Sequence, residues 1–333
     1  MMKILISSHA YAPSIGGIET VTAVLADEFS RRGHSVKIVT QTPGETLENV
    51  SRSPSSGLLV SLLKWCDVYW QNNLSLRTIW PALFMRKPIV VTHQGSYCRP
   101  TNGIDLALRT QRIVANRVTG VAISQYVASF FSPPPIVIPN PFDAGVFRNN
   151  GTTGRNLDLI FVGRLVSEKG VDLLLNALGD LKRRSLEPQL TIVGSGPEET
   201  KLRHLTSDLR LDGQVQFVGS KRDEALAKEL QRHKILVVPS RYDEPFGVVA
   251  LEGIACGCAV IGSNGGGLPQ AIGPCGVMFA NGDVDALSEK IATLLAASEK
   301  RGQLLANAPQ HLARFHSSVI ADCYLDIFRS KIQ

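Results

Sequence analysis

Short runs of valine, isoleucine and leucine alternate with amphipathic segments along almost the whole chain. In the first half we expect helices at residues 19–32 and around 58–64, and strands at residues 3–7, 35–40, 68–71, 88–92, 120–124 and 136–139. This alternation predicts an α/β fold with parallel sheets, because each helix returns the chain to the edge where the next strand begins.

The alternation restarts after a polar, glycine-rich stretch at residues 149–155. There we expect strands at residues 157–162, 189–193, 215–218, 235–239 and 259–262, and helices at residues 171–183, 198–209, 248–256, 285–297 and 317–330. A chain of 333 residues is too long for one ordinary core. We therefore predict two Rossmann-like domains, residues 1–148 and 149–315, and a helix in residues 316–333 that packs back toward the first domain.

Hydropathy and charge limit where the protein can reside and what it can bind. No apolar run reaches 18 residues, and the run at residues 4–6 is too short for a signal-peptide core, so we expect a cytoplasmic protein. Residues 1–150 carry 14 Lys+Arg against 8 Asp+Glu, and residues 151–333 carry 21 against 21, so the first half holds the whole net charge of +6. That half can face nucleic acid, an anionic membrane or a phosphorylated acceptor, or only solubilise the protein.

The six cysteines include no CxxC pair. Cys256 and Cys258 lie in a stretch of alanine, glycine and isoleucine. We interpret them as small buried hydrophobic residues in preference to metal or redox ligands.

A glycine pair, Gly16 and Gly17, follows the first expected strand in the motif PSIGGIE. Such a turn lets backbone N–H groups approach a phosphate at a helix N-terminus, although a plain strand-to-helix turn has equal support. The motif is not GxGxxG, and no acidic residue ends the expected strand at residues 35–40. Both features argue against an NAD-dependent dehydrogenase.

Two cations, Arg164 and Lys169, follow the first strand of the second half in the motif FVGRLVSEKG. Ligands of open α/β sheets bind beyond the carboxyl ends of the strands, so these side chains suit a diphosphate leaving group. The alternative is two solvated surface charges. A glycine-rich turn after the next strand, with Gly194 and Ser195, also suits close approach by a nucleotide, or is only a turn.

Two carboxylates, Glu244 and Glu252, bracket the segment EPFGVVALE. Glu252 lies on an apolar helix, where an ionised carboxylate needs partners such as a ribose diol, or a salt bridge at the helix edge. Glu244 can accept from hydroxyls of a sugar. Pro245 is well placed near a helix start, and the amides that follow it can face an anion: Phe246, Gly247 and Val248.

His93 follows the expected strand at residues 88–92, in the motif VVTHQGS. The end of a parallel strand is a ligand position, so we expect this imidazole to contact the sugar, with a structural role as the alternative.

In order and spacing, the motifs resemble glycosyltransferase family 4, the retaining GT-B enzymes. The matching segments are PSIGGIE, THQG, IPNPFD, FVGRLVSEKG, IVGSGPE, VQFVG and VVPSRYDEPFGVVALEGIACG. The resemblance implies a GT-B fold, with two Rossmann-like domains facing across a cleft, the second binding the nucleotide-sugar and the first the acceptor. It also implies retention of anomeric configuration, no cofactor and no catalytic metal.

The resemblance assigns roles to single residues. Arg164 and Lys169 would hold the diphosphate, and Glu252 the ribose. Glu244 and the amides after Pro245 would hold the sugar and a phosphate, with Gly16, Gly17 and His93 near the sugar from the first domain. It places further donor contacts at Gly163, Gly194, Ser195 and Val218.

We therefore predict transfer of a hexose from a UDP-sugar, with UDP-glucose as the favoured guess, to a hydroxyl of a saccharide or lipid-linked acceptor in glycan or polysaccharide synthesis. No nucleic-acid partner is expected, and contact of the basic first half with a membrane surface stays open. The alternatives are another GT-B enzyme, such as a sugar-nucleotide epimerase or a phosphorylase, and a non-catalytic GT-B subunit that binds nucleotide-sugar.

Overall fold

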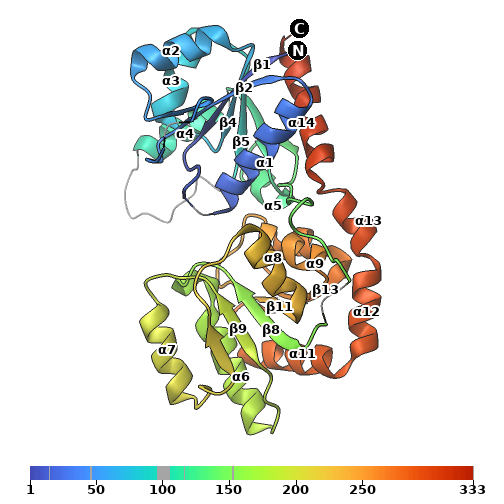
Figure 1. Cartoon of the computed structure of the whole chain (residues 1–333). Coiled ribbons are helices and arrows are strands. Elements are labelled where there is room, and N and C mark those ends of the chain that lie inside the picture. The colour runs from blue at the N-terminus through green and yellow to red at the C-terminus, as the bar shows by residue number, and fades with distance from the viewer. Residues whose placement is uncertain (15, 46, 96–105, 116, 152–153, 333) are drawn as a thin grey trace. The chain divides into compact units, whose positions relative to one another are not determined.

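The computed structural model describes residues 1–14, 16–45, 47–95, 106–115, 117–151 and 154–332. Parts of the sequence motifs lie outside the described residues, namely positions 15, 96, 152 and 153, as does the cysteine at position 98. The chain divides into two compact units, one of Met1–Pro141 with Phe315–Gln333 and the other of Phe142–Arg314. Each unit is a sheet flanked by helices (Figure 1).

The described strands of the first unit form a parallel sheet in the order β3-β2-β1-β4-β5-β6-β7. The strands are β1 (Lys3–Ser8), β2 (Ser35–Thr40), β3 (Val50–Arg52), β4 (Val68–Asn72), β5 (Ile89–His93), β6 (Thr119–Ala122) and β7 (Ile136–Val137). The helices are α1 (Gly17–Arg31), α2 (Ser56–Trp65), α3 (Leu76–Phe84), α4 (Leu106–Ala115), α5 (Gln125–Ala128) and α14 (Ser317–Ile332).

Alternate side chains of each strand serve opposite faces of this sheet, as the two-residue period of a strand requires. Tyr69 of β4 belongs to a core cluster with Leu62 of α2 and Ile79 of α3. The next residue, Trp70, points the other way and packs against the ring of Tyr324 of α14, with 5.0 Å between ring centroids. Helices α2 and α3 therefore cover one face, and α14 covers the other.

The last helix, α14, is fixed to α1 by a buried carboxylate. Glu28 of α1 accepts a hydrogen bond of 2.6 Å from the Ser317 hydroxyl and pairs with Arg32. Arg32 in turn donates to the Ser318 carbonyl oxygen at 3.0 Å. Since the charge of Glu28 is paired and hydrogen-bonded, its burial costs little, and the C-terminal helix becomes part of the first unit.

The described strands of the second unit form a parallel sheet in the order β10-β9-β8-β11-β12-β13. The strands are β8 (Leu157–Val162), β9 (Leu190–Val193), β10 (Val215–Phe217), β11 (His233–Val238), β12 (Ala259–Ser263) and β13 (Gly276–Phe279). The helices are α6 (Val171–Arg183), α7 (Glu199–Asp208), α8 (Asp223–Arg232), α9 (Val248–Ala255), α10 (Leu268–Ile272), α11 (Val284–Ala296), α12 (Ser298–Ala306) and α13 (Ala308–Ala313), with the short 3₁₀ turns η1 (Ser167–Lys169) and η2 (Gly273–Cys275).

Both sheets reverse their strand order beside their first strand. In the first unit β1 lies between β2 and β4, and in the second β8 lies between β9 and β11. The connections on the two sides of such a point leave toward opposite faces, and a crevice opens at the carboxyl ends of the two central strands. The prediction of two Rossmann-like parallel-sheet domains is confirmed, and this topology marks where each unit can bind a ligand.

Two further features bear on the sequence predictions. Within the described ranges, no helix combines the length and the apolar character needed to cross a bilayer. Cys256 and Cys258 are fully buried, and burial raises the pKa of each thiol to about 12. Both thiols therefore stay protonated at neutral pH and behave as small core residues.

Candidate functional site

The loops that follow β8 and β11 meet at the switch point of the second unit. Gly170 closes η1 with φ of 67°, and a Cβ atom there would lie 2.0 Å from the carbonyl oxygen of Pro239. The amide of Arg241 donates to the Glu168 carbonyl oxygen at 2.8 Å. Only glycine permits this backbone approach, which brings η1 against the segment that carries the carboxylate Glu244.

Lys169 and Glu244 form an ion pair across these two loops. Lys169 Nζ donates to Glu244 Oε1 at 2.5 Å and to the Tyr242 hydroxyl oxygen at 3.2 Å. The Tyr242 hydroxyl donates to Glu244 Oε2 at 2.5 Å, and the Ser240 hydroxyl donates to Glu244 Oε1 at 2.6 Å. Glu244 is 6% exposed and its carboxylate accepts from three side chains, so its burial is compensated.

The backbone of Glu244 is held as firmly as its side chain. Its carbonyl oxygen accepts from the Gly267 amide at 2.6 Å. Gly266 has φ of 62°, and a Cβ atom there would lie 2.2 Å from the same oxygen. The turn after β12 (residues 264–267) therefore holds the backbone of Glu244, and this close approach explains the glycine at position 266.

Arg164 is the second cation of this edge. It is exposed and forms no ion pair with any residue that the structure describes. Burial is the main cause that raises the pKa of Tyr242, and Glu244 adds to it, while the positive charge of Arg164 opposes the rise. The charge of Arg164 therefore acts on Tyr242, and its exposed guanidinium is open to an anion.

Helix α9 begins at Val248, four residues after Glu244. Phe246 is buried, and Gly247 caps the helix with φ of 101°, where a Cβ atom would meet Leu268 Cδ1 at 2.6 Å. Val248 is the first helical residue. The first-turn N–H groups of a helix lack intrahelical acceptors and attract anions, so this end of α9 offers amide donors beside Pro245.

Glu252 lies on the second turn of α9 and is partly buried. Burial raises the pKa of its carboxyl to about 7, and the nearby charges of Asp143 and Asp223 add to the rise. The carboxyl has no hydrogen-bond or ion-pair partner among the described side chains. A carboxylate in this setting gains from any ligand that supplies hydrogen-bond donors.

The remaining donor-site predictions lie on the other side of β8. Gly194 follows β9, and a Cβ atom there would lie 1.8 Å from the Gly163 carbonyl oxygen. Ser195 shares a hydroxyl hydrogen bond of 2.9 Å with Ser220. The Val218 amide donates to the Ile192 carbonyl oxygen, which extends the β9–β10 pairing. These residues line the same carboxyl edge of the sheet as Arg164.

In the first unit a buried amide network supports the N-terminus of α1. Asn72 Nδ2, at the end of β4, donates to Thr22 Oγ1 at 2.8 Å and to the Ile18 carbonyl oxygen at 3.2 Å. Gln94 Nε2 donates to Asn72 Oδ1 at 2.6 Å, and Gln94 pairs with the amide of Asn140. The network holds the first turn of α1, which carries the glycine pair.

The predicted glycine pair occupies the start of that helix. Gly16 is the N-cap residue and Gly17 the first helical residue. A Cβ atom at Gly16 would lie 2.7 Å from Glu19 Oε2, whereas a Cβ atom at Gly17 would meet none of the described atoms within 4 Å. The space in front of Gly17 is thus open to a ligand.

His93 ends β5 and is 1% exposed. Its ring stacks on Phe131 with 4.3 Å between centroids. Burial lowers the pKa of the imidazole to about 4, so His93 is neutral at physiological pH. Any role in a reaction is therefore that of an uncharged hydrogen-bonding group.

Residues 146–311, most of the second unit, match the family model described as "Glycosyl transferases group 1". The chain belongs to this glycosyltransferase family. It is 26% identical to the D-inositol 3-phosphate glycosyltransferase of Segniliparus rotundus, over 96% of this chain and 85% of that protein. It is 31% identical to a GDP-mannose-dependent phosphatidylinositol monomannoside mannosyltransferase of Mycolicibacterium smegmatis, over 53% of this chain and only 48% of that protein.

The glycosyltransferase also resembles solved structures over its full length. Anabaena HepE, crystallised in complex with UDP and glucose, matches with a TM-score of 0.82 and 20% identity, covering 99% of this chain and 100% of that one. The likeness confirms the GT-B fold that the motifs predict.

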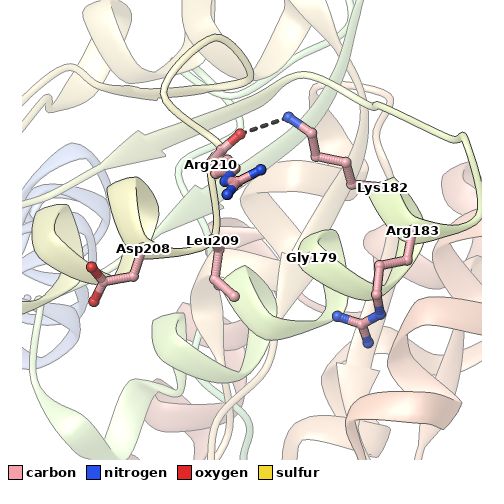
Figure 2. Close-up of a pocket in the computed structure, with 6 residues that line it drawn as sticks. All are labelled: Gly179, Lys182, Arg183, Asp208, Leu209 and Arg210. Atoms are coloured by element: carbon pink, nitrogen blue, oxygen red, sulfur yellow. Dashed lines mark hydrogen bonds between the residues drawn. The ribbon is translucent and has the colours of Figure 1, made fainter.

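A surface hollow of about 330 Å³ in the second unit lies elsewhere (Figure 2). Its lining residues come from the ends of two helices: Gly179, Lys182, Arg183, Asp208, Leu209 and Arg210. Helices α6 and α7 run back from the carboxyl ends of their strands, so their last turns lie at the opposite edge of the sheet. The hollow is therefore not part of the glycosyltransferase site.

Sequence reasoning did not assign roles to Ser240, Tyr242, Asn72 and Asn140. Tyr242 belongs to the quoted segment YDEPFG, and Asn140 to the quoted segment IPNPFD. The signal was therefore present for both, but their hydrogen-bond partners lie far away in the sequence. Asn72 belongs to no quoted motif, and only its position at the end of the fourth strand could have marked it as a site residue.

Proposed function

We propose that this glycosyltransferase moves a hexose from a nucleoside diphosphate sugar to a hydroxyl of a saccharide or lipid-linked acceptor. A UDP-sugar is the favoured donor, with UDP-glucose the first to test. We further propose that anomeric configuration is retained and that no metal takes part. The observation that carries the proposal is the pair of cations, Arg164 and Lys169, beside Tyr242 and Glu244 at the switch point of the second sheet.

Departure of the diphosphate requires stabilisation of its growing negative charge. Lys169 is fixed by Glu244 and Tyr242, so its ammonium group is already oriented when a ligand arrives. Arg164 forms no ion pair with a described residue and can provide a bidentate contact. The first-turn amides of α9 add neutral donors, and preorganised donors of this kind account for a large part of many rate enhancements.

Glu252 is proposed to bind the ribose. Its carboxyl has no partner among the residues that the structure describes, and two adjacent ribose hydroxyls supply two donors to one carboxylate. Donors favour the ionised form and lower the carboxyl pKa from its raised value near 7. Nucleotide binding should then release a proton from Glu252.

Glu244 is proposed to accept a hydroxyl of the transferred sugar. Because it already accepts from Lys169, Tyr242 and Ser240, the sugar would replace one of these donors. Exchange of the Lys169 contact would free the ammonium group for the diphosphate. Glu244 thereby couples sugar binding to the position of the cation.

The attacking hydroxyl is proposed to approach on the face from which the diphosphate leaves. A phosphate oxygen of the departing group takes its proton, the new glycosidic bond forms, and the old sugar–phosphate bond breaks. This scheme requires no protein nucleophile. His93 is neutral because burial lowers its pKa to about 4, and its proposed role is a hydrogen bond to the sugar.

The proposal for the donor rests on two kinds of relative. HepE is described in complex with UDP and glucose, and the Mycolicibacterium relative is named for GDP-mannose. A thermal-shift panel of UDP-, GDP- and ADP-sugars therefore tests the nucleotide first, since a true donor raises the melting temperature by mass action.

The decisive test is donor turnover with the best nucleotide-sugar of that panel, measured as nucleotide release with and without candidate acceptors. The anomeric configuration of the product is read by NMR. Replacing both cations, Arg164→Ala with Lys169→Ala, should abolish most turnover. Turnover of the double variant near that of the native enzyme would reject the proposal, and so would a donor that binds but is neither transferred nor hydrolysed.

A further inference from the structure

Helix α3 carries large apolar side chains on its solvent face. Trp80 is 47% exposed, Leu83 is 42% exposed and Phe84 is 82% exposed. Positions 80, 83 and 84 share one side of a helix, whereas Ile79 and Ala82 are buried against the sheet. These three large apolar side chains lie next to one another on the side of α3 that faces away from the sheet. A contiguous exposed apolar patch of this kind indicates an interaction surface.

Two arginines accompany this patch. Arg77 lies one turn before Trp80, and Arg86 follows two residues after Phe84. Both arginines are exposed and form no ion pair with a described residue. Helix α2 packs beside α3 and, like α3, contains no acidic residue (Figure 1).

We propose that this patch, defined by Trp80, Leu83, Phe84, Arg77 and Arg86, docks on an anionic lipid bilayer. An interfacial helix buries its apolar face at the boundary between headgroups and acyl chains, while its arginines contact anionic headgroups. Tryptophan is suited to this boundary because its ring is apolar and its N–H is polar. The net positive charge of the first half has the sign that such a surface attracts.

A second copy of the chain is a poorer occupant. A two-fold interface brings each patch against itself, so the unpaired arginines would face the same arginines of the other copy. No acidic residue of α2 or α3 could compensate them. An anionic lipid surface attracts the arginines, so the repulsion between the two copies does not arise, and it covers the same apolar side chains. The proposal does not depend on the donor or on the reaction.

Vesicle sedimentation tests the proposal with the full chain. We expect binding to vesicles that mix phosphatidylglycerol with phosphatidylcholine, weak binding to phosphatidylcholine alone, and loss of affinity as salt rises. Trp80→Ser with Phe84→Ser should lower the partition coefficient by roughly tenfold or more. Val319→Ser is the matched control, because Val319 is exposed on α14, on the opposite face of the sheet, and should leave binding unchanged.

Tryptophan fluorescence locates the contact. Of the three tryptophans, Trp70 is fully buried, Trp65 is partly buried under the ammonium group of Lys37, and Trp80 is half exposed, so most of a blue shift on addition of anionic vesicles should come from Trp80. Trp80→Phe should still bind while most of the shift disappears. Vesicle binding of the Ser double variant equal to that of the Val319→Ser control overturns the proposal. So does a monomer–dimer equilibrium that the Ser double variant abolishes in the absence of lipid, when vesicles bind neither protein.

Discussion

Replacing Lys169 with methionine separates the structural from the chemical role of the cluster at the switch point. The substitution keeps most of the volume of the side chain but leaves the buried carboxylate of Glu244 without its cation. Removing one partner of a fully buried ion pair typically costs about 3–5 kcal/mol. The Lys169 side chain is 23% exposed, and Glu244 keeps the Tyr242 and Ser240 donors, so we expect about 1–3 kcal/mol.

A loss of about 2 kcal/mol in the free energy of unfolding lowers the melting temperature of a unit of this size by roughly 4–8 °C. Adding Glu244→Gln should recover most of that loss, because the uncompensated charge is then gone. Turnover behaves differently, since neither the single nor the double variant can stabilise the leaving diphosphate with Lys169. We expect kcat to fall by about 10²–10³ in both.

The assays are urea unfolding followed by circular dichroism and nucleotide release from the preferred donor, each on the two single variants and the double variant. The proposal is supported if the double variant recovers stability but not turnover. That result would mean that Glu244 holds Lys169 in place and that Lys169 stabilises the leaving diphosphate. Additive stability effects would refute the pairing. A Lys169→Met enzyme that turns over like the native enzyme would refute the role in catalysis.

The remaining predictions concern other parts of the molecule. In the ligand-free protein the folded pKa of Glu252 lies near 7, above its ordinary value, so the folded state holds that proton more tightly and stability falls as pH rises from about 4.5 to 7. In urea titrations, Glu252→Gln should flatten the dependence of stability on pH. In calorimetry, nucleotide affinity of the native protein should rise with pH, and Glu252→Gln should remove that rise. An unchanged pH dependence of stability would contradict the assignment. Gly170→Ala should destabilise the second unit by about 1–3 kcal/mol, because the new Cβ atom meets Pro239 at a positive φ, whereas Gly302→Ala on α12 meets nothing within 4 Å and should be neutral or stabilising in thermal melts. Chelation of divalent metals with EDTA should leave donor turnover unchanged, and restoration of lost activity by added metal would count against a metal-free mechanism.

The strand and helix pattern of this glycosyltransferase could be predicted because it is local. The expected elements at residues 35–40, 157–162 and 171–183 coincide with β2, β8 and α6. Helix α3 did not stand out because Pro81 lies inside it and interrupts the usual helical signal. Strand β13 was not predicted because it has only four residues, which carry too little periodicity.

The sequence alone determined the chemistry available to the site: cations after β8, a carboxylate pair bracketing the start of α9, and glycines where backbones must approach. It could do so because each motif is short, and its residue types state what it can bind. Only the tertiary structure decided which groups meet. The pairing of Lys169 with Glu244, the amide network around Asn72 and the docking of α14 on α1 join residues far apart in the chain. Such contacts depend on the order of the strands in the sheet. That order arises from packing of the whole sheet and cannot be predicted from any short segment of the sequence.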